Sequence, residues 1–187
     1  MPETIMPGFE RFKPEGSIIG RLLTGYGELE FEMCRCIEAV TTDLDAAIRS
    51  LFQVWNAQDR ITKTANLVSS QYVNAGLGAM FATAVADIDW CRLIRNQYAH
   101  CNWYDTKSEG IMFYNLEELS RQPDKIIFVT SQRHGLPLDL LQHQEEFFKY
   151  VQKCFWHLYS EYCAWAGRPT TPHWPLPAVV ARPRKHN

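Results

Sequence analysis

The sequence predicts an all-α fold: a helical bundle of four to five helices with a small β-hairpin inserted before the last long helix. Three observations favour this fold class. Apolar residues recur every three or four positions over most of the 187 residues. Between residues 110 and 131, short runs of aromatic and β-branched residues replace that period. The content of 46% hydrophobic and 21% charged residues is typical of a globular domain with a buried core.

The chain is expected to have three parts. Residues 1–16 form an extended N-terminal arm, residues 17–167 the helical domain, and residues 168–187 a proline-rich tail that is either an irregular arm or disordered. The arm is inferred from closely spaced residues that disfavour helix: Pro2, Pro7, Gly8, Pro14 and Gly16.

The first helix is expected to begin at Ser17, a residue suited to the N-cap, and to continue to about Val40. Gly25 and Gly27 weaken this helix. They indicate either a break in the helix or the close approach of another helix.

The second helix is expected to follow a cap at Thr42 or Asp43 and to run to Trp55. The periodic residues from Ile61 to Tyr72 form a third helix or a continuation of the second. Three residues then mark the C-terminus of a helix: Asn74, Gly76 and Gly78.

The hairpin is predicted from two short runs, residues 110–115 and residues 125–130, joined by a long connection with a turn signal at Pro123. The last helix is expected to follow Pro137, to run to Trp165 and to stop at Gly167.

Residues 81–103 are predicted to form the helix around which the chain is organised. At about 100° per residue, Arg95 falls on the same stripe as the apolar residues. A guanidinium keeps its charge, so we expect an acid, a water-filled cleft or a ligand beside it. Glu30, on the first helix, is the acid that we expect there. The apolar residues of the stripe are Phe81, Ala84, Val85, Ile88, Cys91 and Tyr98.

Asn96 and His100 lie four positions apart and therefore project to the same side of this helix. Together with Arg95 they form the pattern R-N-x-x-x-H at a helix end. This pattern resembles the motif of the HEPN superfamily, in which a polar residue usually follows the Arg and a His comes further along. The likeness is specific over residues 94–103, and Cys101 stands where many members have a glycine.

The resemblance implies a compact helical domain that forms a homodimer, with the two motifs facing one cleft. Active members are metal-independent endoribonucleases, often in toxin–antitoxin or other defence systems. It therefore implies RNA as the ligand and a cognate antitoxin or regulatory protein as a partner. Inactive members are nucleotide-binding, protein-binding or dimerisation modules, which is the alternative interpretation of this chain.

The chemistry of the three motif residues suits RNA cleavage without a metal. His100 can transfer protons near neutral pH, because an unperturbed histidine titrates near pH ~6.5. Arg95 can bind phosphate oxygens through two hydrogen bonds and stabilise the charge that builds on them. Asn96 can orient His100 or the substrate. A two-fold dimer supplies the second histidine that acid and base catalysis together require.

Structural roles are the alternative for each candidate. Arg95 and Glu30 can form an ion pair that holds the fold, and His100 can be a helix-end residue favoured by the helix dipole. Three aromatic residues near the motif either stack on RNA bases or cover the core: Tyr98, Trp103 and Tyr104.

Charge and composition limit the ligands, the cellular location and the cofactors that we expect for this protein. The formal net charge is −2, so any contact with RNA must be local. The N-terminal residues lack the apolar stretch of a signal peptide, and no run reaches about eighteen apolar residues. We therefore expect a cytoplasmic protein without a membrane span, in which the six cysteines are reduced. Apart from the pair His143 and Glu146, the histidines show no ligand spacing, so neither a metal nor a cofactor is expected.

Overall fold

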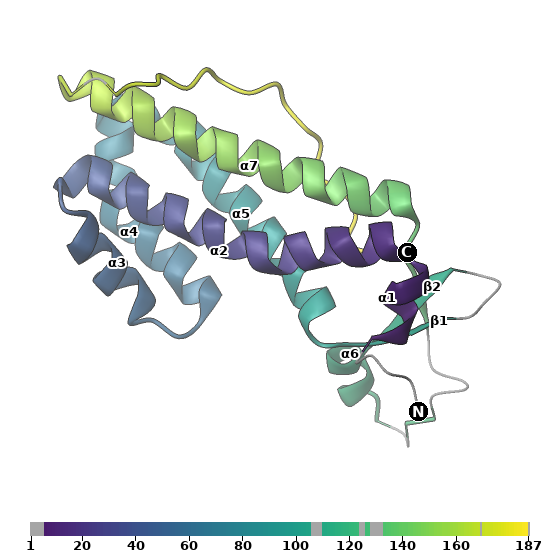
Figure 1. Ribbon diagram of the computed structural model, residues 1–187. Helices are drawn as coiled ribbons and strands as arrows, with labels where there is room; N and C mark the ends of the chain where they lie inside the picture. Colours follow the sequence, from purple (N-terminus) through teal and green to yellow (C-terminus); the bar gives the residue numbers. More distant parts are fainter. Residues whose placement is uncertain (1–5, 106–109, 124–125, 128–132, 169, 187) are drawn as a thin grey trace. The chain divides into compact units, whose positions relative to one another are not determined.

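The computed structural model describes residues 6–105, 110–123, 126–127, 133–168 and 170–186. Over these residues the chain forms seven helices and three short strands (Figure 1). The predicted fold class, mainly helical with a small β insertion before the last long helix, is confirmed. The helices are α1 (Pro7–Arg11), α2 (Lys13–Thr41), α3 (Leu44–Phe52), α4 (Ala57–Asn74), α5 (Gly78–Ala99), α6 (Leu116–Ser120) and α7 (Leu138–Trp165). The strands are β1 (Cys101–Asp105), β2 (Ile111–Asn115) and β3 (His134–Gly135).

The chain divides into two compact units. The helical unit comprises residues 25–92 and 147–182 and holds most of α2, α5 and α7 together with α3 and α4. The sheet unit comprises the described residues of 1–24, 93–146 and 183–187 and holds α1, α6 and the three strands.

The core of the helical unit is built around Tyr72 of α4, whose side chain is inaccessible to solvent. Its ring stacks on Phe81 at 4.5 Å between centroids and lies 4.9 Å from Tyr162 of α7. Its hydroxyl donates a hydrogen bond of 3.4 Å to the carbonyl of Cys36 in α2. The side chain of Tyr72 thus links α4 to α2, α5 and α7 through ring contacts and the hydrogen bond of its hydroxyl.

Side-chain caps begin two of these helices. The Oδ1 of Asp43 accepts a hydrogen bond of 2.9 Å from the backbone of Ala46 in α3, and Asn56 caps α4 in the same way. Asp43 is one of the two predicted caps. Gly76 and Gly167 adopt positive φ just past the ends of α4 and α7, so the last carbonyls of both helices are bonded in Schellman turns.

The N-terminal region differs from the prediction. Within the expected extended arm, α1 forms at Pro7–Arg11 and α2 already begins at Lys13. Ser17 therefore lies inside α2, where its Oγ accepts a hydrogen bond of 2.6 Å from Nη1 of Arg21. Proline fits here because the first turn of a helix does not need its missing N–H. The helix also continues unbroken through Gly25 and Gly27, and a Cβ at either position would meet nothing within 4 Å.

The sheet unit contains a three-stranded antiparallel sheet of order β1-β2-β3. In its register Trp103 lies opposite Phe113, and Phe113 lies opposite His134. The predicted strand at 110–115 corresponds to β2. The second predicted strand falls largely on residues outside the described ranges, and its two described residues, Ile126 and Ile127, are not in a strand.

The helix predicted over residues 81–103 ends at Ala99, and the residues after it form β1 instead. Pairing with β2 satisfies their backbone groups, and the hydrogen bond of 3.0 Å from the N–H of Leu116 to the carbonyl of His100 closes the corner. None of the helices in the described part of the chain has both the length and the apolar character needed to cross a bilayer.

Candidate functional site

The motif residues surround the junction between α5 and β1, in the sheet unit. Arg95 and Asn96 lie in the last turns of α5, and His100 is the single residue between that helix and the strand. The helix ends here because the hydrogen bonds of residues 101–105 go to β2. His100 is thus placed at a helix end, as the sequence predicts.

Arg95 is half-buried rather than fully buried on the apolar stripe. Its Nη1 donates a hydrogen bond of 3.1 Å to Oδ1 of Asn96. Asn96 therefore contacts the guanidinium of Arg95, whereas its amide was expected to orient His100 or a substrate. Glu30, the acid expected beside Arg95, lies 2.8 Å from Nη1 of Arg60 in the helical unit.

The imidazole of His100 is open to solvent, with 56% of its side chain exposed. Its Nε2 lies 3.7 Å from Oε1 of Glu117, whose side chain is 53% exposed. An exposed pair at this distance contributes little to stability. The imidazole of His100 is therefore accessible to a ligand, with the carboxylate of Glu117 nearby.

Two of the three aromatic candidates have core contacts in the structure. Tyr98 is 2% exposed and its hydroxyl donates a hydrogen bond of 2.6 Å to Oε1 of Gln144. Trp103 packs against Phe9 and Phe113 at 5.4 and 5.2 Å between ring centroids. Burial gives Tyr98 a structural role, and its ring cannot stack on an RNA base without unfolding of this region.

Tyr104 is partly exposed and stacks on Tyr114 at 5.1 Å with an interplanar angle of 23°. The guanidinium carbon of Arg133 lies 5.6 Å from the centre of the Tyr104 ring. Tyr104 thus differs from Tyr98 and Trp103, because its partly exposed ring lies beside both a second ring and a cation.

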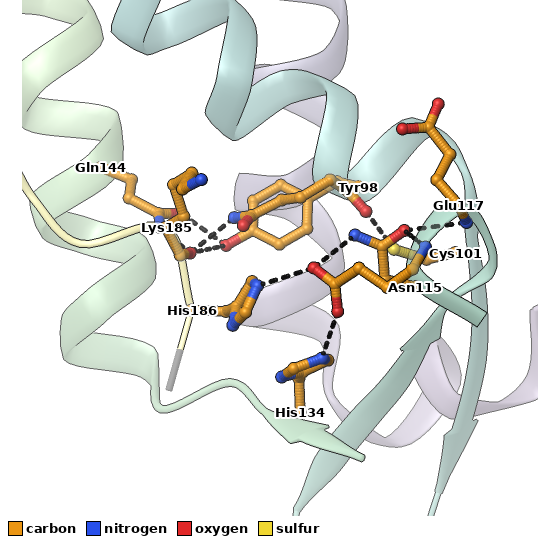
Figure 2. A network of polar contacts seen from close by, with 10 residues as sticks. Tyr98, Cys101, Asn115, Glu117, His134, Gln144, Lys185 and His186 are labelled. Atoms are coloured by element: carbon orange, nitrogen blue, oxygen red, sulfur yellow. Dashed lines mark hydrogen bonds and ion pairs between the residues drawn. The ribbon is translucent and has the colours of Figure 1, made fainter. Parts of the chain in front are cut away.

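A buried polar network joins α5 and α7 to the tail. Gln144 of α7 donates through Nε2 to the carbonyls of Arg184 and Lys185, at 2.9 and 2.6 Å. Gln97 donates to the same Lys185 carbonyl at 2.5 Å. Figure 2 shows Lys185 lying beside Gln144 and Tyr98. The residues predicted as an irregular or disordered tail thus have specific partners at 184 and 185.

Next to this network lies a cluster of one carboxylate and two imidazoles, which we call the Glu–His–His cluster: Glu118, His134 and His186. Nε2 of His134 is 3.0 Å from Oε2 of Glu118, and Nε2 of His186 is 3.3 Å from Oε1. The two imidazole rings are 3.9 Å apart between centroids (Figure 2). The sheet, α6 and the tail each contribute one member.

Asn115 positions the carboxylate of the cluster. Its Oδ1 accepts hydrogen bonds from the backbone of Glu117 and Glu118, which caps α6, while its Nδ2 donates to Oε1 of Glu118 at 3.1 Å. Burial raises the pKa of Glu118, but hydrogen bonds and charge from His134 and His186 outweigh that effect and lower its pKa. The carboxylate is therefore ionised and available as a ligand.

The Glu–His–His cluster was not foreseen from the sequence. Its members are separated by 16 and 52 positions, and the pair noted above for its ligand spacing, His143 with Glu146, is not part of it. The one local signal is Asn115, an N-cap residue three positions before Glu118. It fixes the helix start that carries the carboxylate, but it gives no hint of the two histidines.

No protein-family model matches this chain, and no curated protein or solved structure matches it either.

Proposed function

We propose that this protein is a HEPN-like, metal-independent endoribonuclease that acts as a homodimer through Arg95, Asn96 and His100. The observation that carries the proposal is the position of His100. It is an exposed imidazole at the end of a helix that also carries a half-buried arginine. The proposal places the protein in the cytoplasm, with a cognate antitoxin or regulatory protein as its partner.

In the proposed reaction, the imidazole of His100 from one copy takes the proton of a ribose 2′-OH. The oxygen then attacks the adjacent phosphorus. The second copy's imidazole, in its protonated form, gives a proton to the leaving 5′-oxygen. Glu117, 3.7 Å from Nε2, orients the imidazole. A homodimer is thus part of the mechanism, because one chain supplies one histidine at this site.

Arg95 has the role of stabilising the negative charge that develops on the phosphate oxygens. A guanidinium that is already oriented loses less freedom on binding than a mobile one. The hydrogen bond from Nη1 to Asn96 provides that orientation. Removing Asn96 should therefore reduce the rate of cleavage less than removing Arg95 or His100.

The experiment is cleavage of mixed RNA by the purified protein in the presence of EDTA. We expect cleavage by the wild type and a loss of at least about 100-fold in His100→Ala, the lower range for a general acid or base. His173→Ala is a matched control, because His173 is 54% exposed and also lies beside a glutamate, Glu161, at 2.8 Å. Cleavage that is equal in the wild type and in His100→Ala would refute the proposal.

A non-catalytic, HEPN-like module that binds a nucleotide or a protein is the second candidate. It is favoured by the formal charge of −2 and by Glu117, whose carboxylate near His100 opposes binding of a polyanion. This candidate predicts a ligand or partner surface without turnover, and Arg95 then forms an ion pair that holds the fold or the dimer. Incubation of the wild type with mixed RNA separates it from the nuclease, because this candidate predicts no cleavage, and sedimentation of Arg95→Ala tests whether Arg95 holds the dimer.

A further inference from the structure

We propose that the Glu–His–His cluster is a binding site for a zinc ion, which fastens the C-terminal tail to the β-sheet. The site is separate from the motif at Arg95 and His100, and it does not depend on whether the protein cleaves RNA. All three ligands belong to the sheet unit.

The ligand atoms converge on one place, as a zinc site requires. With zinc–ligand bonds of about 2.0–2.1 Å, two ligands of a tetrahedron lie about 3.3 Å apart. Nε2 of His134 lies 3.0 Å from one carboxylate oxygen of Glu118, and Nε2 of His186 lies 3.3 Å from the other. One ligand atom from each of the three residues lies within 4.8 Å of the other two, so side-chain rotations would bring all three onto one ion.

The surroundings of the ligands favour binding of a cation. His134 is 2% exposed and its ring lies 5.1 Å from that of Phe113, whereas Glu118 is 45% exposed, so the site has one buried ligand and one side that an ion can reach from solvent. Asn115 holds the carboxylate of Glu118 through the hydrogen bond to Oε1. Groups that orient a metal ligand in this way are a regular part of metal sites.

The donor set selects the class of metal. Two imidazole nitrogens and one carboxylate oxygen suit Zn²⁺, whereas Mg²⁺ and Ca²⁺ prefer oxygen ligands. Three protein ligands leave one tetrahedral position for a water molecule. The two histidine rings lie 3.9 Å apart, so both imidazoles can reach one ion.

The helical unit contains a second group of two histidines and one glutamate, and the ligand atoms of this group do not converge on one place. Nδ1 of His157 hydrogen-bonds the carbonyl of Trp174 at 2.8 Å and lies 3.9 Å from Glu161, while His173 reaches the same carboxylate at 2.8 Å. The carbonyl of Trp174 already occupies the ring nitrogen of His157 that faces Glu161. In the described part of the chain, the Glu–His–His cluster is the group whose ligand atoms converge.

The test uses full-length protein, stripped of metal by a chelator and free of any histidine tag. Zn²⁺ affinity is measured by competition with a chromophoric chelator, and Co²⁺ is added separately as a spectroscopic probe. Glu118→Gln and His186→Ala each remove one ligand while leaving the buried His134 in place. His173→Ala is the matched control, and circular dichroism checks the folding of every variant.

We expect one Zn²⁺ per chain and, with Co²⁺, the intense visible absorption of four-coordinate cobalt. Each ligand variant should lose at least about 100-fold in Zn²⁺ affinity, since losing even an outer partner of a ligand costs about 10- to 100-fold. His173→Ala should bind like the wild type, and Mg²⁺ should not compete. Equal affinity in the wild type and in folded Glu118→Gln and His186→Ala, or the absence of the cobalt absorption, would overturn the proposal.

Discussion

The side-chain amide of Gln144 donates a hydrogen bond of 2.6 Å to the backbone carbonyl of Lys185. Gln144 is completely buried, and its oxygen accepts a hydrogen bond from the hydroxyl of Tyr98. One side chain of α7 therefore satisfies a buried phenol and the main chain of the tail at once. Both interactions depend on the side-chain amide, because its Nε2 group donates hydrogen bonds and its Oε1 accepts them.

Replacing Gln144 by leucine should release the tail. Gln144→Leu leaves a buried hydroxyl and two backbone carbonyls without this partner, at a cost of about 2–3 kcal/mol. Trypsin should then cut after Arg184 faster than in the wild type, as followed by mass spectrometry. Gln142→Leu is the control, because Gln142 is exposed on the same helix. Equal rates of cleavage in the two variants would argue against the role of the network.

The ion pair between Arg60 and Glu30 should be important for folding. Their side chains are 17% and 8% exposed, so Arg60→Ala leaves a carboxylate unpaired in the core of the helical unit. We expect a loss of about 3 kcal/mol in the free energy of unfolding, measured with urea. The double variant Arg60→Ala/Glu30→Ala should lose less than the sum of the two single variants.

The control for that pair is Arg49→Ala, which removes a surface ion pair. Arg49 and Asp45 are 72% and 73% exposed and lie four positions apart on α3. We expect a change of about 0.5 kcal/mol or less. A loss as large as that of Arg60→Ala would mean that burial does not explain the difference.

Two glycine substitutions should have opposite effects. Gly27→Ala should raise the free energy of unfolding by about 0.5–1 kcal/mol, because Gly27 lies inside α2 and an added Cβ meets nothing within 4 Å. Gly78→Ala should lower it by about 1 kcal/mol or more, because its Cβ would lie 2.6 Å from Cγ2 of Val73. Urea unfolding under reducing conditions measures both, and a shift of the same sign in the two variants would contradict this prediction.

Stability should fall at alkaline pH because of buried thiols. Burial raises the pKa of Cys36 to about 12, against about 8.5 in an unfolded chain. The folded state therefore keeps a proton that the unfolded state releases. Stability is fully present below the unfolded pKa and is lost as pH rises toward the folded pKa.

At pH 10 this effect lowers the free energy of unfolding by about 2 kcal/mol for Cys36. Burial also raises the pKa of Cys34, to about 11, so Cys36→Ala should reduce the alkaline loss without abolishing it. Unfolding in urea with a reducing agent, at pH 7.5 and pH 10, measures the loss. The same loss in Cys36→Ala as in the wild type would show that other groups cause it.

The start of α3 and the end of α4 could be predicted because their signals are local. Asp43 caps α3 and Gly76 ends α4, and each acts through hydrogen bonds to residues no more than five positions away. The end of α5 could not be predicted in the same way. The sequence carries no glycine or proline stop signal near Ala99, and β2, a partner distant in sequence, decides that residues 101–105 become a strand.

The candidate sites also differ in whether local sequence could predict them or whether they depend on contacts between distant residues. The pattern formed by Arg95, Asn96 and His100 could be recognised from neighbouring positions in the sequence, whereas the partner of Glu30 could not. Glu30 pairs with Arg60, thirty positions later, because the packing of two helices brings them together. The Glu–His–His cluster is the extreme case, since its third member lies in a tail without regular secondary structure.

Each unit is assembled from segments that lie far apart along the chain. The sheet unit needs residues before position 25, residues 93–146 and the stretch after position 182, and the helical unit needs residues 147–182. During synthesis on the ribosome, neither unit can be completed until these late segments have emerged. Apolar surface of the earlier segments therefore stays uncovered until residues 147–182 have emerged, and such incomplete chains are prone to aggregate.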